Sequence, residues 1–331
     1  MNLASQARDF IKEHDAELVD LIRTLCAIPA PSNQEEQRAL FCQDWLTRAG
    51  GKAVIIDDAL NVVCPVGDVR GEVVVIMAHT DTVFPDLEPL PLSEREGRIY
   101  CPGVCDDTTN LALLMMTAKY VLQAGLRPEC GLVFAANAGE EGLGNLKGSK
   151  KLMADYGGRT REVISLDGTW EHLCNQAVGS ARYRVVLKTE GGHAFSDFGN
   201  RNAIHLIASL ISSLYALKVP QEGNSRSTYN VGQISGGTSV NTIAEQAEML
   251  VELRSDSGKC LAELEAMFSA LIEAYSNMGA AIEVTTIGRR PCSGQLQPGL
   301  QEALTERYTA IVRQETGQTP EIVSGSTDCN I

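Results

Sequence analysis

The sequence predicts an α/β protein that combines a three-layer α/β/α domain, built on a mostly parallel sheet, with a smaller inserted domain. Short runs rich in β-branched residues alternate with segments of helical periodicity, which is typical of a parallel sheet covered by helices on both faces. After about residue 178 the pattern changes to half-buried strands and helices in the order βαββαβ, the split-βαβ (ferredoxin-like) arrangement. A chain of 331 residues is long enough for both domains.

The elements of the larger domain follow from the spacing of apolar residues. Helices are predicted where apolar residues recur every three to four positions, at 6–27, 34–49 and 111–122. Buried strands are predicted where apolar residues run together, at 53–56, 61–64, 72–78, 131–136 and 162–166. A helix at 298–316 resumes this pattern near the end of the chain.

The smaller domain is predicted from the change in pattern after residue 178. Its strands are expected at 181–189, 228–235, 245–254 and 281–287, and its helices at 202–217 and 260–278. We therefore expect one domain made of residues 1–177 and 290–331, interrupted by a second domain of residues 178–289.

Composition narrows the class of partner. A net charge of −14 makes nucleic acid and anionic membranes poor partners, because both would repel the chain. No apolar run reaches the roughly 18 residues that span a bilayer, and the first residues lack the basic and apolar regions of a signal peptide. We expect a cytoplasmic protein whose ten scattered cysteines are free thiols.

Acid-rich segments follow four of the predicted strand ends or helix starts. His79 and Asp81 come directly after the strand at 72–78, and ligand sites in open α/β sheets gather beyond the carboxyl ends of strands. An imidazole that binds a metal usually needs a partner on its other nitrogen, which a carboxylate two residues on could supply. Taken alone, however, a His-x-Asp segment is more often a solvated loop.

The other acid-rich segments strengthen the pattern. A helix N-cap role explains one of Asp106 and Asp107 but not both, whereas a carboxylate that bridges two cations about 3.5–4 Å apart is what a two-metal site requires. Glu140 and Glu141 follow the strand at 131–136 and suit one metal ligand and one general base. With Asp167 after the strand at 162–166, the four sites together predict a metal-dependent hydrolase.

These motifs resemble a known family, the di-zinc exopeptidases and deacylases that include peptidase T, glutamate carboxypeptidase G, succinyl-diaminopimelate desuccinylase and acetylornithine deacetylase. The matching segments are 78–83, 103–107, 139–142, Asp167 and 191–194. The resemblance extends from about residue 20 to the last residue. It implies a catalytic α/β/α domain with an inserted lid domain that commonly forms a homodimer.

The resemblance also implies two zinc ions per subunit, with cobalt or manganese as other options. By position, His79 and Asp167 would bind one ion and Glu141 would bind the other. Asp106 would bridge the two ions.

Three further residues acquire roles in the chemistry from the same resemblance. Asp81 would orient His79, and Glu140 would be the general base. His193, in the lid domain, looks like the family histidine that reaches a neighbouring active site and polarises the scissile carbonyl.

The substrate carboxylate would be held by lid residues. Asn241 and Arg290 resemble the family positions with this role, although a turn asparagine and a solvated arginine are equally good interpretations. Arg254 is an alternative anion contact or a member of a structural ion pair.

One expected residue is missing from the match. In this family a final histidine, downstream of a Ser-Thr-Asp-x-Asn segment, completes the second zinc site; 326–330 matches that segment, and the sequence stops at Ile331. We expect the sequence to be part of a longer chain. If the protein ends there, zinc binding at the Glu141 site should be weak, because one of about four ligands is lost. His14, His172 and His205 are expected to be surface or core residues rather than substitutes.

The predicted function is therefore that of a metallopeptidase acting on short peptides, with Glu140 as the base for a zinc-activated water. An N-acyl-amino-acid deacylase on the same site is an alternative, because specificity in such a site lies in lid and loop contacts. A non-catalytic metal- or peptide-binding member is an alternative of another class. The missing histidine favours it, and the adjacent Glu140 and Glu141 argue against it.

Overall fold

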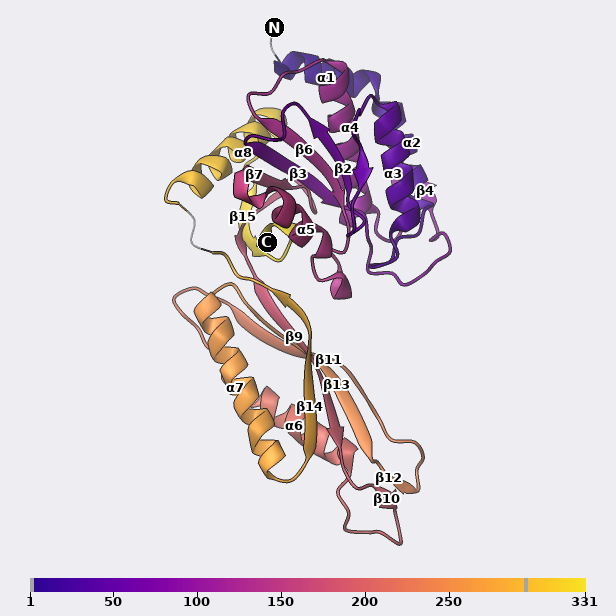
Figure 1. Ribbon diagram of the computed structural model, residues 1–331, viewed down its shortest axis with the longest axis vertical. Helices are drawn as coiled ribbons and strands as arrows, with labels where there is room; N and C mark the ends of the chain where they lie inside the picture. The colour runs from indigo at the N-terminus through magenta and orange to yellow at the C-terminus, as the bar shows by residue number, and fades with distance from the viewer. Residues whose placement is uncertain (1–2, 295–296) are drawn as a thin grey trace. The chain divides into compact units, whose positions relative to one another are not determined.

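The computed structural model describes residues 3–294 and 297–331 and contains two compact units (Figure 1). Unit 1 comprises the chain up to His172 together with Thr327–Cys329 and Ile331. Unit 2 comprises Leu173–Ser326 and Asn330. The chain thus leaves unit 1 once and returns to it at the end.

Unit 1 is built on a five-stranded sheet with the strand order β1-β2-β6-β3-β7. Its strands are β1 (Ile55–Ile56), β2 (Val62–Val66), β3 (Val73–His79), β6 (Gly131–Asn137) and β7 (Thr160–Ser165). The central strand β3 pairs in parallel with β6 and β7, whereas β2 pairs antiparallel to both β6 and β1. The mostly parallel sheet predicted from the buried apolar runs is confirmed.

Helices cover both faces of this sheet, as predicted (Figure 1). The helices of unit 1 are α1 (Leu3–Glu13), α2 (Asp15–Cys26), α3 (Glu36–Arg48), α4 (Thr109–Gln123) and α5 (Lys147–Tyr156). Side chains of α2, α3 and α4 form one core with Phe134 and Ala136 of the sheet. On the opposite face, Leu152 of α5 packs against Val75 and Met77 of β3. Both faces of β3 are therefore buried, and only its carboxyl end can present polar groups to a ligand.

Three local features of unit 1 differ from the prediction. The single helix expected at 6–27 is two helices, because His14 has non-helical dihedral angles while its ring stacks on Phe10. A hairpin of β4 (Ser93–Arg95) and β5 (Arg98–Tyr100) was not predicted, nor was α5. The hairpin turn has positive φ at two consecutive central residues, as tight two-residue turns require.

Unit 2 contains a four-stranded antiparallel sheet with the order β11-β13-β9-β14. Its strands are β9 (Gly179–Lys188), β11 (Ser227–Gly236), β13 (Gln246–Ser255) and β14 (Ala281–Arg290). Helices α6 (Ala203–Tyr215) and α7 (Gly258–Asn277) pack against one face and complete the predicted βαββαβ order. Each helix begins at a side chain that accepts backbone N–H groups, Asn202 for α6 and Ser257 for α7.

Further elements also belong mainly to unit 2. They are β8 (His172–Ala177), β10 (Gly192–His193), β12 (Thr242–Ile243), α8 (Leu300–Thr316) and β15 (Glu321–Gly325). Strand β15 pairs with β8 in a separate two-stranded sheet. In the structure, α8 and β15 belong to the compact unit 2. The sequence analysis instead assigns residues 290–331 to the catalytic domain. The domain boundaries stay a prediction.

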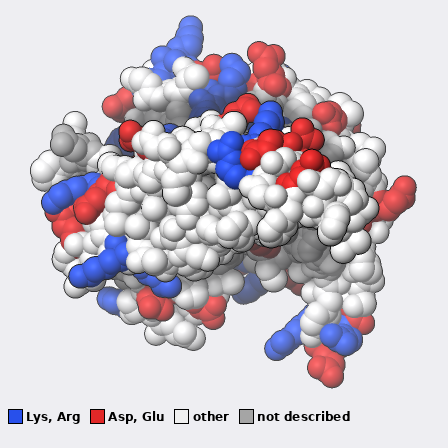
Figure 2. Space-filling view, turned by 90° about the horizontal axis from the view of Figure 1, so that it is seen from below, with Lys and Arg blue, Asp and Glu red and all other residues white. Residues whose placement is uncertain are grey.

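Several bulk properties bear on the sequence predictions. None of the helices in the described part of the chain has the length and apolar character that crossing a bilayer would need. All ten cysteines are free, as predicted. On the face drawn in Figure 2, Lys and Arg side chains are scattered among Asp and Glu rather than gathered in one basic area.

Candidate metal centre

His79 is the last residue of β3 and only 1% of its surface is exposed. Its Nε2 atom lies 3.1 Å from Oδ1 of Asp106, and its Nδ1 atom lies 3.0 Å from the carbonyl oxygen of Asp81. Burial alone lowers the pKa of His79, but the carboxylates of Asp106 and Asp81 outweigh burial and hold this pKa well above its usual value. The buried strand thus ends in an imidazole surrounded by negative charge.

Asp81 connects the end of β3 to the loop that carries the two glutamates. Its buried carboxylate accepts hydrogen bonds from the backbone N–H groups of Glu140 and Glu141, both at 3.0 Å, and from Oγ of Ser32 at 2.7 Å. Burial raises the pKa of Asp81, but His79 and these hydrogen bonds outweigh burial and hold this pKa at about 2. The carboxylate lies 3.5 Å from Nδ1 of His79, farther than the Asp81 carbonyl, so Asp81 contacts the imidazole mainly through its backbone.

Asp106 and Asp107 point to different neighbours, although they are adjacent in sequence. Both belong to the short segment η1 (Val104–Thr108), where their own dihedral angles are not helical, and this segment leads directly into α4. The Asp106 side chain is 63% exposed and lies beside His79, whereas Asp107 is fully buried and accepts hydrogen bonds from the His79 N–H and from Nδ2 of Asn110. Burial and the nearby charge of Asp167 raise the pKa of Asp107 well above its usual value.

Glu140 and Glu141 lie in a closed loop between β6 and α5. The N–H of Leu146 donates to the carbonyl of Gly139, which joins the two sides of the loop. Gly139 has a positive φ of 71°, and a Cβ atom on Gly144 would lie 2.5 Å from the Cα of Gly139, so the close approach requires glycine at both positions. Burial and the charge of Asp106 raise the pKa of Glu141 to about 7.

Side chains from distant parts of the chain anchor this loop. Asn61, fully buried at the start of β2, accepts a hydrogen bond from the Ala138 N–H and donates to the Gly148 carbonyl. Lys147 forms an ion pair of 2.8 Å with the buried Glu35. The sequence predicts the two glutamates but not these anchors, since neither Asn61 nor Glu35 has a recognisable motif.

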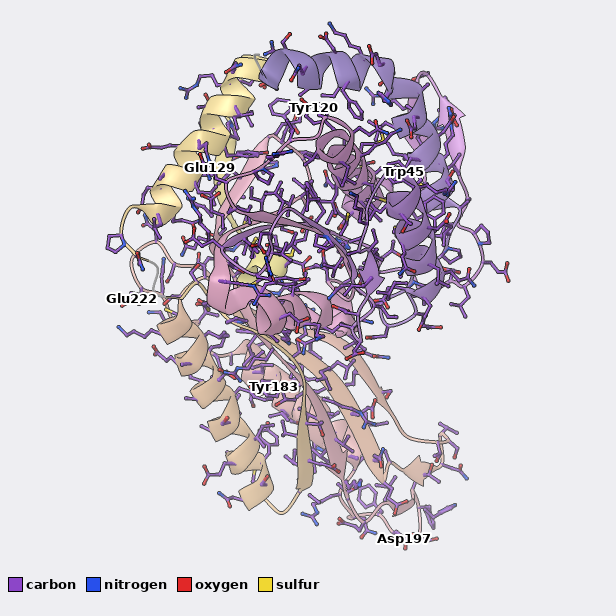
Figure 3. All side chains as sticks on the ribbon, turned by 45° about the horizontal axis from the view of Figure 1, so that its top comes forward. Trp45, Tyr120, Glu129, Tyr183, Asp197 and Glu222 are labelled. Carbon is purple, nitrogen blue, oxygen red and sulfur yellow. The ribbon has the colours of Figure 1, made fainter. Side chains whose placement is uncertain are left out.

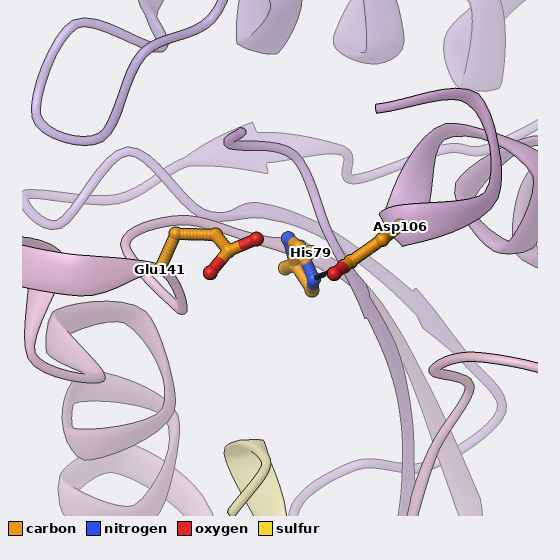
Figure 4. Close-up of side chains that lie close together, drawn as sticks. All are labelled: His79, Asp106 and Glu141. Atoms are coloured by element: carbon orange, nitrogen blue, oxygen red, sulfur yellow. Dashed lines mark hydrogen bonds and ion pairs between the residues drawn. The ribbon is translucent and has the colours of Figure 1, made fainter. Parts of the chain in front are cut away.

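Two groups of side chains have the geometry to hold a cation. In one, ligand atoms of His79, Asp106 and Glu141 all lie within 4.8 Å of one another (Figure 4). In the other, His79 is grouped with Asp107 and Asp167 within the same distance. The sequence predicts four of these five residues as ligands. The exception is Asp107, which is grouped with His79 and Asp167. The resemblance implies Asp106 in that place. The division of ligands between two ions therefore stays a prediction.

The chemistry of these groups fits a divalent cation such as zinc, manganese or cobalt. Imidazole and carboxylate are ligands that all three ions accept, and three protein ligands with an open position are typical of catalytic zinc sites. Burial is the main cause that raises the pKa values of Glu141 and Asp107, and the charges of Asp106 and Asp167 raise them further. A bound cation would relieve the repulsion between these acids.

A further buried acid lies close to the centre. Asp328 is 1% exposed and accepts hydrogen bonds from Nδ2 of Asn137, at 2.6 Å, and from Oγ of Ser149. Burial raises the pKa of Asp328. Asn137 pairs with His79 in the β3–β6 ladder. The hydrogen bond from Asn137 therefore connects Asp328 to the strand ends that carry the candidate ligands. The sequence marks Asp328 as part of a family segment, but it does not predict this contact.

In unit 2, His193 and Asn241 lie side by side. His193 pairs with Thr242 in the β10–β12 ladder, and the N–H of Ala194 donates to the Asn241 carbonyl. Nδ1 of His193 accepts the N–H groups of Phe195 (3.3 Å) and Ser196 (3.4 Å). In the neutral ring the proton is therefore on Nε2, which leaves His193 able to donate a hydrogen bond through that atom.

Arg254 and Arg290 lie at the opposite end of the unit 2 sheet. Both face Ser180 of β9 in the strand register. Arg290 is 4% exposed and donates to Oγ of Ser326, whereas Arg254 forms an ion pair of 2.7 Å with Glu252. Figure 3 shows the two ends of unit 2, with Asp197, a neighbour of His193, at one end and Glu222 at the other. Within one copy of unit 2, the four lid residues therefore form two separate pairs.

A buried histidine surrounded by carboxylates at the carboxyl ends of parallel strands is the arrangement that metal-dependent enzymes of the α/β/α type use. The model of peptidase family M20/M25/M40 matches residues 75–331, and the chain belongs to that family. It is thus a hydrolase, and the resemblance inferred from the motifs is confirmed.

Individual relatives are distant but similar over most of their length. The chain is 24% identical over 329 residues to a succinyl-diaminopimelate desuccinylase of Bordetella petrii, covering 93% of this chain and 84% of that protein. The aminopeptidase PepT of Bacillus cereus has a similar fold, with a TM-score of 0.68, 20% identity, and coverage of 95% and 86%. A dinuclear metal-binding M20 peptidase of Bacillus subtilis has a TM-score of 0.62, 17% identity, and coverage of 96% and 85%.

Proposed function

We propose that this protein is a metal-dependent exopeptidase that hydrolyses the amide bond of short peptides. The observation that carries the proposal is the pair of His–carboxylate groups that share the buried His79, with the nearly buried Glu140 on the same loop as the ligand Glu141. We propose two zinc ions per subunit among these five side chains, with His79 a ligand of one of them, and cobalt or manganese would suit the same ligands. We place the protein in the cytoplasm, as the sequence predicts.

The residues of the site divide the chemistry between them. His79 and the neighbouring carboxylates would hold a divalent cation, which would supply Lewis acidity and lower the pKa of a water molecule to about 7. Glu140 accepts the proton of the attacking water at its carboxylate and then donates it to the nitrogen of the leaving amine. Asp81 keeps Glu140 in place through the hydrogen bond to its backbone N–H. His193 donates a hydrogen bond from its Nε2–H to the substrate oxygen that becomes negative.

The separation of the lid residues supports a homodimer. At about 3.3 Å per residue, the ten-residue strands of unit 2 place His193 and Asn241 roughly 25–30 Å from Arg254 and Arg290, which is too far for one small substrate. We propose that His193 and Asn241 act on substrate bound to the partner chain. Arg290 would hold the substrate carboxylate in its own chain, because a buried guanidinium is a strong carboxylate partner.

The names of the relatives favour two kinds of substrate. One fold relative is an aminopeptidase, and one sequence relative removes a succinyl group from diaminopimelate. We propose a short peptide as the substrate and an N-acyl amino acid as the second candidate, which the desuccinylase relative favours. Both present an amide bond near a free carboxylate.

A substrate panel tests the proposal. Dipeptides, tripeptides and N-acyl amino acids are incubated with the zinc-loaded protein and with the Glu140→Gln variant. If the wild type hydrolyses peptides and the variant does not, the exopeptidase proposal is supported. If the wild type hydrolyses acyl amino acids but no peptides, the second candidate is supported. A panel left intact by a protein that has bound zinc would contradict both.

A further inference from the structure

Arg38, on α3, is a buried arginine that donates to oxygen atoms from three parts of unit 1. It is 3% exposed. Its Nε and Nη2 atoms donate to the carbonyl of Ile28, and Nη2 also donates to the carbonyl of Leu25. Its Nη1 atom donates to the carbonyl of Thr80 at 2.8 Å and to Oγ1 of Thr108 at 3.4 Å. Among the described residues, no carboxylate accepts a hydrogen bond from this guanidinium.

The residues contacted by Arg38 adjoin the candidate metal ligands. Thr80 lies between His79 and Asp81, and Thr108 follows Asp107 directly. The other side of the Thr80 residue is held by β6, because its N–H and Oγ1 donate to the carbonyl of Asn137. Arg38 thus holds the carbonyl side of Thr80, the residue between His79 and Asp81. The same Nη1 atom also contacts Thr108, which directly follows Asp106 and Asp107.

The end of α2 allows this charge to be buried without a carboxylate partner. Leu25 lies in the last turn of α2 and Ile28 just beyond it; the Leu25 carbonyl accepts the N–H of Ile28 as well as Arg38, and carbonyls at a helix C-terminus carry partial negative charge. The neighbouring groups include the buried Cys26 and Cys42, and the carboxylate of Asp81 attracts the guanidinium without a hydrogen bond. A methionine would fill similar space without the cost of burying a charge. Arginine differs in supplying a planar set of donors that reaches the His79–Asp81 and Asp106–Thr108 segments at once.

We propose that Arg38 is a positioning residue that sets the spacing between the His79–Asp81 and Asp106–Thr108 segments and thereby the affinity of the metal centre. The inference rests on the proposed metal-dependent function and adds to it a residue that touches neither cation nor substrate. Loss of the guanidinium releases the Thr80 carbonyl, so that His79 and Asp106 can move apart.

The test compares Arg38→Met with Arg48→Met. Arg48 is on the same helix, but its side chain is 66% exposed and forms an ion pair with Asp44 one turn away. Metal-stripped proteins are titrated with Co²⁺ and Zn²⁺ in competition with a chromophoric chelator, and folding of the metal-free forms is checked by circular dichroism. Arg38→Met is expected to raise the Kd of the tighter cation about 10- to 100-fold, as loss of groups that orient metal ligands typically does. Arg48→Met should leave it nearly unchanged.

Two further variants keep the test decisive. If Arg38→Met does not fold, Arg38→Lys replaces it: a folded lysine variant with weakened cation binding supports the proposal, because one ammonium group cannot reach both Thr80 and the end of α2. Added guanidinium at millimolar concentration should restore cation affinity to Arg38→Gly. A folded Arg38→Met or Arg38→Lys protein that binds cations as tightly as the wild type overturns the role of Arg38. Absence of cation binding by the wild type would instead overturn the proposed function, and with it this inference.

Discussion

Glu140 and Glu141 show how neighbouring residues of the same type acquire different roles. Both backbone N–H groups donate to the carboxylate of Asp81, so one buried side chain positions the pair. The Glu141 carboxylate lies with His79 and Asp106, where burial and negative charge raise its pKa to about 7. The Glu140 carboxylate belongs to neither of the two cation groups found among the described residues, and its proposed role is that of the general base.

The role of Glu140 gives the first prediction. Glu140→Gln keeps the shape of the side chain but cannot accept a proton, so turnover should fall by about 10²- to 10⁴-fold, the usual cost of losing a general base. Cation content should remain that of the wild type, and elemental analysis of the same samples checks it. Glu141→Gln is the matched control and should lose cation affinity as well as turnover. Unchanged turnover in Glu140→Gln would rule out this residue as the base.

At the scale of elements, the glycine loop between β6 and α5 determines where the glutamates lie. A Cβ atom on Gly144 would lie 2.5 Å from the Cα of Gly139. Relief of this contact would require the backbone itself to shift, which costs more than the movement of a side chain. We predict that Gly144→Ala destabilises the protein by about 1–3 kcal/mol, as overpacking does, and weakens cation binding. Gly158→Ala is the control, since a Cβ atom there meets no neighbouring atom within 4 Å. Equal urea midpoints for the two variants would contradict this account of the loop.

A pH effect is expected in unit 2. The hydroxyl of Tyr183 donates to Glu265, and burial together with this hydrogen bond raises the pKa of Tyr183 from 10.0 to about 12. Because the folded value is the higher one, the neutral phenol stabilises the fold fully below pH 10, and this contribution is lost as the pH rises through 12. The wild type should therefore lose more stability than Tyr183→Phe over that pH range, as measured by urea unfolding at each pH. Equal losses would show that Tyr183 does not contribute.

The elements also show what sequence patterns can predict. The buried strand ending at His79 and the βαββαβ order of unit 2 are confirmed because their apolar periodicity matches the faces that they bury. Helix α5 was missed because it follows a glycine-rich loop and buries only Gly148, Ser149 and Leu152. A pattern with so few buried positions carries little helical signal.

At the scale of the whole molecule, contacts between distant segments complete the metal centre. Asp328 contacts Asn137 across 191 residues, and Arg38 contacts Thr80 across 42. Motifs identify the groups that take part in the chemistry, because those residue types are rare in such spacing. They do not identify the supporting residues, whose partners are determined only by folding. Four of the five residues in the two cation groups were therefore predicted as ligands, whereas Ser32, Arg38 and Asn61 were found only in the structure.

The proposed dimer yields a prediction about mixtures of inactive variants. If His193 acts on the partner chain, a heterodimer of His193→Ala and Glu140→Gln chains has one intact site, composed of Glu140 from one chain and His193 from the other. After subunit exchange, an equimolar mixture should recover about a quarter of wild-type turnover, since half of the symmetric dimers are hybrids. Each variant alone is the control. A mixture no more active than its components, with exchange verified by mass spectrometry, would place His193 in its own chain's site.

The central claim is that the residues around His79 hold catalytic divalent cations. Calorimetric titration of the metal-stripped full-length protein with Zn²⁺, beside a folded His79→Ala variant, tests this claim most directly. The account predicts two bound zinc ions per chain in the wild type and loss or strong weakening of the ion that His79 holds in His79→Ala, because His79 is a member of both ligand groups and offers one nitrogen atom to a cation. A wild type that binds no zinc, or a His79→Ala variant that binds it equally well, would contradict the account.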